Sequence, residues 1–180
     1  DYYNERTDAQ KKSQIQRMST YCTKVYGLNP DLLYVPPDNA EFLPYSPVSF
    51  EEWEPHYTQT IDRPLRIGHA PSNRKGKGTD FVINALEELK AEGYAFDFVL
   101  IEGVSNAEAK LIYQDIDVLV DQLFFGWYGG LALEVMALGK PVLVYLREED
   151  LKFIPKEMKE ELPIINVHAG TIKSGLKEVL

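Results

Sequence analysis

The sequence predicts an α/β fold in which a Rossmann-like parallel sheet carries helices on both faces. From Arg63 to the end of the chain, short apolar runs of strand length alternate with longer segments of helical period, the pattern of consecutive βαβ units. The first of these runs leads into a basic, glycine-containing loop and then a helix, as is typical of ligand-binding sheets of this class. A chain of 180 residues is long enough to bury a sizeable core.

The predicted sheet consists of short runs rich in branched apolar residues. Its strands are placed near Leu65–Gly68, Phe96–Ile101, Val118–Val120, Val142–Tyr145 and Ile164–Val167.

The helix after the first strand has recognisable signals at both ends. Thr79 is expected to be its N-cap, and Gly93 suits the left-handed position that ends a helix. The side chains expected on its buried face are Phe81, Val82, Ala85, Leu86 and Leu89.

Two further helices are expected before the last strands. Ser105 and Glu108 have the spacing of a capping box and predict a helix to about Tyr113. The next helix begins near Gly129 and ends before Gly139, because a proline soon afterwards prevents its continuation.

Residues 1–62 differ from the rest of the chain. A polar helix is expected at Asp8–Thr20, and the prolines that follow leave room only for short extended pieces such as Glu41–Leu43. We interpret residues 1–62 as a linker-like region. Because the chain starts without methionine and stops in a helical pattern, both ends are expected to be cut from a longer protein.

The overall charge argues against two classes of partner. The formal net charge of −9 disfavours nucleic acid and anionic membranes. The single cysteine, Cys22, cannot form an internal disulfide, and no transmembrane-length apolar run or leader is present. A cytoplasmic location is expected, with peripheral attachment to the inner membrane face through a missing domain left open.

The loop from His69 to Thr79 is predicted to bind an anion. Arg74, Lys75 and Lys77 place positive charge where the dipole of the next helix is also positive. The stretch Arg63–Lys77 holds five basic residues and no acidic one, although the chain as a whole is acidic. The alternative is a solvated basic loop.

Two sharper phosphate motifs do not fit this loop. The distance from Gly68 to Gly76 is too long for a Walker loop, and Gly78 stands where Ser or Thr should follow the lysine. Phe81 occupies the third glycine position of a dinucleotide fingerprint. The sequence therefore argues against a P-loop NTPase and against an NAD dehydrogenase.

A second candidate loop, Asp121–Leu131, precedes a helix that carries Glu134. Gly129 and Gly130 offer unblocked amides to a phosphate or to sugar hydroxyls. Glu134 can accept two vicinal ribose hydroxyls, or can simply complement the positive helix end. Tyr128 can stack on a base or sugar ring, or pack internally.

The segment Gly126–Val142, which reads GWYGGLALEVMALGKPV, resembles the donor-binding helix of family-4-type retaining glycosyltransferases of the GT-B fold. The turn Lys77–Thr79 resembles the Lys-Gly segment of that family, and the resemblance extends over Arg63–Leu180. It implies that residues 63–180 are the C-terminal, nucleotide-sugar-binding half of a GT-B fold. Residues 1–62 would then be the tail of the N-terminal acceptor domain with the interdomain linker. The substrate would be a UDP- or GDP-linked sugar, transferred to an acceptor such as a glycan or lipid, as in polysaccharide synthesis, without a metal or other cofactor.

The resemblance also implies roles for particular residues. Lys77 and Arg74 would neutralise the diphosphate, and Glu134 would bind ribose. The donor-binding set is Arg74, Lys77, Gly78, Thr79, Gly129, Gly130, Leu131 and Glu134, with His69, Ser72, Asp121 and Tyr128 as further candidates. No catalytic side chain is assigned. Because transfer aligns donor and acceptor between two domains, this chain is expected to bind donor but to need the missing N-terminal domain for turnover.

Two positions depart from the family pattern. The family's second glutamate, eight residues before Glu134, is Gly126 here, so sugar recognition differs, or Asp121 takes part, or catalysis is lost. The family's arginine position holds Ser72. His69 could line the site or be packed. The alternatives left open are an inactive GT-B-like scaffold that acts through protein contacts, and a sugar-nucleotide epimerase.

Overall fold

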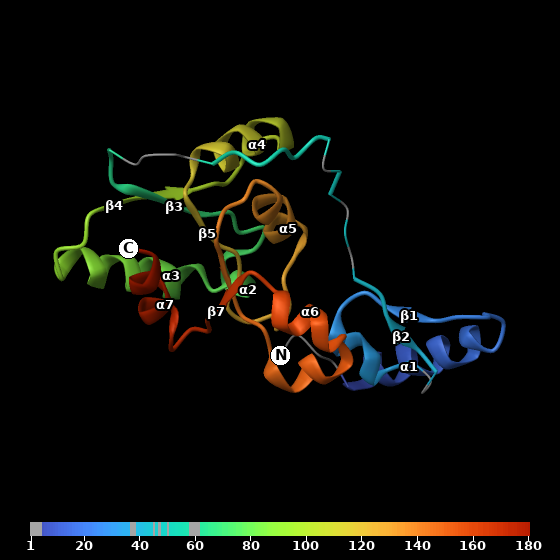
Figure 1. Ribbon diagram of the computed structural model, residues 1–180. Coiled ribbons are helices and arrows are strands. Elements are labelled where there is room, and N and C mark those ends of the chain that lie inside the picture. The colour runs from blue at the N-terminus through green and yellow to red at the C-terminus, as the bar shows by residue number, and fades with distance from the viewer. Residues whose placement is uncertain (1–4, 37–38, 45, 47, 50, 58–61) are drawn as a thin grey trace. The chain divides into compact units, whose positions relative to one another are not determined.

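The computed structural model describes residues 5–36, 39–44, 46, 48–49, 51–57 and 62–180 (Figure 1). The chain divides into two compact units. The first comprises Asp1–Tyr45 and Glu148–Glu160, and the second comprises Ser46–Arg147 and Glu161–Leu180. Among the residues described, no helix is both long and apolar enough to cross a membrane.

The second unit is built on a five-stranded sheet in which all strands are parallel. Its strands are β3 (Leu65–His69), β4 (Phe96–Leu100), β5 (Val118–Val120), β6 (Val142–Val144) and β7 (Ile164–Asn166), in the order β4-β3-β5-β6-β7. Each predicted strand is present, with an end that differs by no more than one residue. The structure confirms the predicted Rossmann-like α/β fold.

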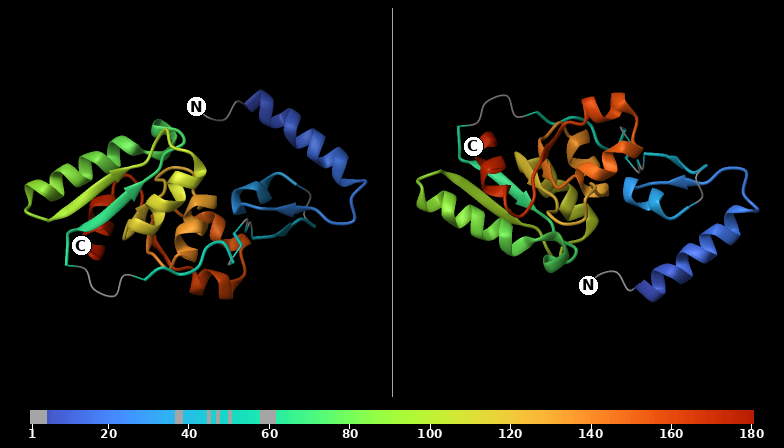
Figure 2. Two further views of the ribbon diagram at one scale, coloured as in Figure 1. Left: turned by 90° about the horizontal axis from the view of Figure 1, so that it is seen from above. Right: turned by 90° about the horizontal axis from the view of Figure 1, so that it is seen from below.

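Strand order places the helices on both faces of the sheet. The chain moves from β3 to its neighbour β4 and then crosses back past β3 to β5. With right-handed crossovers, α3 (Thr79–Ala91) and α4 (Asn106–Asp115) therefore lie on opposite faces. In both views of Figure 2, α3 runs alongside β4 and β3. The remaining helices of this unit are α2 (Arg74–Lys77), α5 (Gly130–Ala137) and α7 (Ile172–Val179).

The main core lies between the sheet and the pair α3 and α7. One set of strand side chains packs against inward residues of both helices. This cluster includes Ile67, Val118, Val120, Leu143, Val82, Ala85, Leu86, Leu89, Ile172 and Leu176. The prediction that Phe81 is buried is wrong, because its side chain is 47% exposed. Its ring instead packs edge-on against Phe124, with centroids 5.6 Å apart.

The start of α3 also differs from the prediction. The N-cap is Gly78, whose φ of 78° links α2 directly to α3, so Thr79 is the first helical residue and not the cap. The Thr79 hydroxyl lies 2.9 Å from Nε2 of His69, which takes the hydroxyl away from any capping role. Asn73 caps the preceding α2 by accepting a hydrogen bond from the Gly76 amide.

The other helix boundaries follow their signals. The Ser105–Glu108 capping box forms at the start of α4, and Gly93 has the left-handed φ of 94° after α3. The next helix, α5, begins at Gly130 with Gly129 as its N-cap, close to the predicted start near Gly129.

The first unit holds short elements and one long helix. They are α1 (Glu5–Ser19), β1 (Tyr26–Gly27), η1 (Pro30–Tyr34), β2 (Glu41–Phe42), η2 (Glu148–Phe153) and α6 (Lys156–Glu161), whose last residue belongs to the second unit. The predicted opening helix and the extended piece at Glu41 are confirmed. Two prolines of the interrupted region, Pro37 and Pro47, lie outside the described residues.

Part of the expected linker belongs to the second unit. The His56 amide donates to the Leu138 carbonyl over 3.0 Å, and the Trp53 ring stacks on Tyr113 with centroids 6.4 Å apart. A domain boundary after residue 62 stays a prediction.

Candidate functional site

The two loops singled out in the sequence leave neighbouring strands at the point where strand order reverses. β3 and β5 are hydrogen-bonded neighbours, and their carboxyl ends carry the loops His69–Thr79 and Asp121–Leu131. Ligands of open α/β sheets bind at such a switch point. The loops contact each other directly, since the Leu123 amide donates to the Lys77 carbonyl over 3.2 Å.

Glycine allows this close approach of the two loops. A Cβ placed on Gly76 would lie 3.0 Å from the Phe125 ring. One placed on Gly78 would lie 3.1 Å from Leu123 Cβ, and the left-handed φ of 78° at Gly78 also favours glycine. The glycines of the first loop thus serve its packing against the second loop.

One carboxylate joins the two predicted phosphate-binding groups. Nζ of Lys77 lies 2.5 Å from Oδ1 of Asp121, and the Gly129 amide donates to Oδ2 over 3.2 Å. The Asp121 side chain is fully buried, and that of Lys77 is 13% exposed. Lys77 and the beginning of α5 therefore converge on a single anionic group, which here is a side chain of the protein itself.

Arg74 is engaged elsewhere. Its guanidinium binds both carboxylate oxygens of Glu102, with Nε–Oε1 and Nη2–Oε2 distances of 2.8 and 2.5 Å. The hydrogen bond from Arg74 holds the pKa of Glu102 below its usual value. The structure thus brings Lys77, but not Arg74, into contact with Asp121.

His69 and Thr79 form a buried link between strands and helix. Nδ1 of His69 lies 2.8 Å from the Val120 carbonyl, which can only accept, so Nδ1 carries the proton. Nε2 then accepts from the Thr79 hydroxyl. Burial lowers the pKa of His69, so the ring is neutral at pH 7. Neither side chain reaches the surface, and a direct contact of either with a ligand stays a prediction.

Gln122 organises the second loop and was not singled out in the sequence. Its Oε1 accepts from the amides of Phe124 and Phe125 over 2.8 and 2.6 Å. Its Nε2 donates to the carbonyls of Trp127 and Tyr145 over 2.7 and 3.1 Å. The side chain is 1% exposed, so these bonds define the backbone path into α5. A polar residue two positions after an apolar strand is the sequence signal for this role.

Glu134 lies one turn into α5 and is partly buried. Burial raises its pKa, and the positive charge of Lys110 partly offsets this effect. The pKa of Tyr113 on α4 is raised by burial first and then by the charges of Glu134 and Asp121. Tyr113, which sequence reasoning missed, therefore lies within electrostatic reach of both carboxylates.

Gly126 occupies a position that disfavours a side chain. Its φ is 77°, and a Cβ built there would lie 3.1 Å from Cβ of Arg147. The Gly126 carbonyl also accepts from the Arg147 amide over 2.9 Å. The backbone at this position therefore disfavours any side chain, including a glutamate.

The remaining candidates differ in accessibility. Tyr128 is 7% exposed and stacks on Trp127, with centroids 4.5 Å apart. Ser72 is exposed, and Gly130 and Leu131 are partly exposed in the first turn of α5. Tyr128 thus packs in the loop, while Gly130 and Leu131 remain accessible to a ligand.

No metal cluster is found within the described part of the chain: no group of three or more His, Cys, Asp or Glu side chains is arranged to hold an ion. The chain matches no protein-family model, and no curated protein matches it significantly. The five-stranded parallel sheet defines the fold class.

Proposed function

We propose that the second unit is the nucleotide-sugar-binding domain of a retaining glycosyltransferase. The observation that supports this most is the convergence of Lys77 and the Gly129 amide on one carboxylate at the switch point of the sheet. A diphosphate oxygen is bound by the same two kinds of donor, a lysine ammonium and an amide at a helix N-terminus.

In this proposal the diphosphate takes the place of the Asp121 carboxylate at Lys77. The accessible first turn of α5, Gly130 and Leu131, supplies further amides, and Glu134 accepts the ribose hydroxyls from the same helix. Fixed cations and amides stabilise the charge that builds on a departing diphosphate. The resemblance of Gly126–Val142 to the donor-binding helix of family-4-type enzymes supports the same assignment.

A second candidate function is an inactive scaffold of the same fold that acts through protein contacts. It is favoured by the internal pairing of both predicted cations, Arg74 with Glu102 and Lys77 with Asp121. In that case the ion pairs are structural and the chain has no affinity for sugar nucleotides.

A ligand panel distinguishes the two. We expect UDP, GDP or one of their sugars to raise the melting temperature of the chain, because a ligand that binds only the folded state stabilises it. Lys77→Met should weaken binding of that ligand by about tenfold or more, the effect of one charge-assisted hydrogen bond. Lys75→Met, which removes an exposed lysine of the same loop, is the matched control and should change the affinity by less than about twofold. Absence of millimolar binding by every member of the panel would leave the scaffold as the better account.

A further inference from the structure

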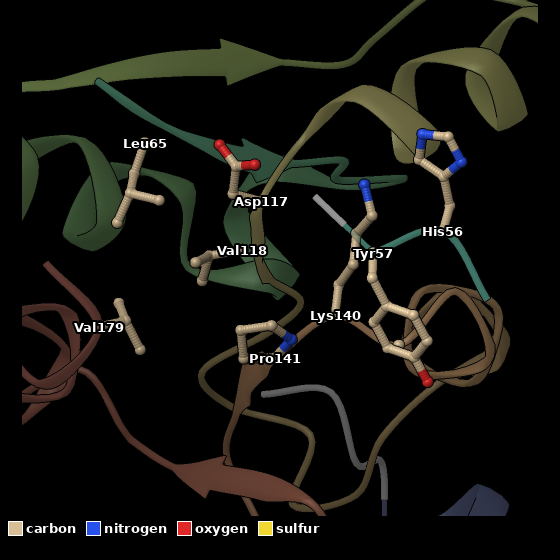
Figure 3. Close-up of a pocket in the computed structure, with 9 residues that line it drawn as sticks. His56, Tyr57, Leu65, Asp117, Val118, Lys140, Pro141 and Val179 are labelled. Carbon is tan, nitrogen blue, oxygen red and sulfur yellow. The ribbon is translucent and has the colours of Figure 1, made fainter. Parts of the chain in front are cut away.

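A cavity opens at the amino ends of the strands, whereas the Lys77 site lies at their carboxyl ends. Its volume is about 350 Å³, within the range of roughly 300–1,000 Å³ found for small-molecule sites (Figure 3). Its apolar wall consists of Leu65 and Val118 at the amino ends of β3 and β5, Pro141 just before β6, and Val179 of α7. Because the two candidate loops leave the carboxyl ends of the same strands, this cavity is separate from the proposed donor site.

A buried lysine lies at the polar side of the cavity. Lys140 is 7% exposed, and its Nζ donates to the carbonyls of Gln114 and Ile116, both over 2.5 Å. These carbonyls belong to the C-terminal end of α4, where the helix dipole is negative and favours a cation. An ammonium group has three N–H donors. The third has no acceptor among the residues that the structure describes.

The charge of Lys140 is not balanced by a carboxylate of its own. Asp117 also lines the cavity, but Arg63 binds it with Nη1–Oδ2 and Nη2–Oδ1 distances of 2.6 and 3.2 Å. The Arg66 amide donates to the same carboxylate over 2.7 Å. Arg63 and Asp117 therefore cancel, which leaves one positive charge on the cavity wall. Burial lowers the pKa of Lys140, as expected for a cation that lacks a full counter-charge.

We infer that this cavity binds a small organic carboxylate, whose oxygen accepts the third N–H of Lys140 while its alkyl part packs on the apolar wall. Such a ligand supplies both the missing acceptor and the missing negative charge. The rim is held in place independently, because the Tyr57 ring packs on Gly139 and the His56 amide is bound to Leu138. This inference does not depend on the proposed transferase function.

The test compares two ligands of nearly the same shape on the wild-type chain. Sodium butyrate and butyramide are titrated separately, and the NMR signal of the Lys140 ε-methylene group is followed. We expect a saturable shift with butyrate and at least tenfold weaker binding of butyramide, because only the carboxylate brings a negative charge that pairs with the ammonium group. If butyrate gives no saturable shift, or if butyramide binds equally well, Lys140 only caps α4 and the inference is wrong.

Variants locate the site. Val179→Phe adds a larger side chain to the apolar wall and leaves the Lys140 residue unchanged. It should fill the cavity and abolish the butyrate shift. Lys140→Met lacks the Lys140 reporter, so binding to it is followed through the methyl signals of Val118, which also lines the cavity. This variant should abolish the preference for butyrate, whereas Lys173→Met, at a lysine that pairs with Glu88 and Glu92 on the surface, should keep it. Should Lys140→Met fail to fold, the wild-type ligand pair and Val179→Phe still decide the question. Unchanged butyrate binding by Val179→Phe would place the ligand elsewhere and overturn the inference.

Discussion

The ammonium group of Lys77 lies 2.5 Å from Oδ1 of the fully buried Asp121 carboxylate, and this pair connects the loops that follow β3 and β5. The other oxygen of Asp121 accepts from the Gly129 amide at the beginning of α5. A ligand phosphate that uses Lys77 must therefore compete with a carboxylate already in place. The affinity of the proposed site for a diphosphate therefore depends on how much more strongly Lys77 binds the phosphate than the Asp121 carboxylate.

Replacing Asp121 by Asn tests this competition. Asn keeps the shape but removes the negative charge, so Lys77 becomes more attractive to a diphosphate. We expect the affinity for UDP or GDP to rise by about tenfold, a change of roughly 1.4 kcal/mol. The free energy of unfolding should fall by on the order of 3 kcal/mol, because a buried ion pair is broken.

Calorimetry and denaturant unfolding measure the two effects of Asp121→Asn. Asp97→Asn, at an exposed carboxylate of β4, is the control and should alter neither. Weaker nucleotide binding by Asp121→Asn would mean that Asp121 positions Lys77 for the ligand and does not compete with it.

His69 should make stability depend on pH. Its pKa is lowered in the folded state by burial, so the unfolded chain, with a histidine pKa near 6.5, takes up a proton first as the pH falls. The contribution of His69 is therefore fully present above about pH 7 and declines toward pH 5, by at most about 1.4 kcal/mol per pH unit.

Denaturant unfolding across this pH range, in the wild type and in His69→Gln, measures the effect. The variant should show a flatter profile, whereas His168→Gln, at an exposed histidine, should follow the wild type. Parallel profiles for wild type and His69→Gln would contradict the neutral, buried assignment.

The sheet could be predicted from the sequence because its signals are local. Runs such as Val118–Val120 are apolar on both sides and short, and the structure has a strand at those residues. The capping box of α4 is likewise a local pattern, formed by Ser105 and Glu108. The two candidate loops lie together because they follow the carboxyl ends of two neighbouring parallel strands, β3 and β5.

The partners of the polar side chains could not be predicted, because they depend on tertiary contacts. Thr79 has the residue type of an N-cap, yet the nearby ring of His69 takes its hydroxyl. Phe81 has the spacing of a core residue, yet it lies outside the helix face that meets the sheet. The pairing of Arg74 with Glu102 joins residues 28 positions apart, which no local pattern reveals.

Gly126 offers a test of backbone strain in the second loop. Gly126→Ala places a side chain at φ 77°, which costs about 1–2 kcal/mol for a non-glycine residue, and adds the 3.1 Å contact with Arg147. Gly103→Ala is a matched control, since Gly103 has φ 68° but no atom within 4 Å of the added Cβ. Both variants should lower the free energy of unfolding, Gly126→Ala by more. Equal losses would show that the Arg147 contact adds nothing.

Gln122 should contribute strongly to stability, although glutamine is usually found at the protein surface. Gln122→Glu keeps the size of the side chain but turns the Nε2 donor into an acceptor, which faces the carbonyls of Trp127 and Tyr145. Leaving buried carbonyls without donors costs about 1–3 kcal/mol each, so a loss of at least 2 kcal/mol is expected in denaturant unfolding. Gln10→Glu, on the exposed face of α1, should cost less than about 0.5 kcal/mol. A neutral effect of Gln122→Glu would mean that the loop does not depend on these bonds.

The measurement that bears most directly on the proposed function is the dissociation constant of the best-bound UDP or GDP ligand, determined by calorimetry for the wild type, Lys77→Met and Lys75→Met. We predict measurable binding by the wild type, an affinity reduced about tenfold or more by Lys77→Met, and little change with Lys75→Met. Equal affinities of the two lysine variants, or no binding of any such ligand by the wild type, would contradict a diphosphate site between Lys77 and α5.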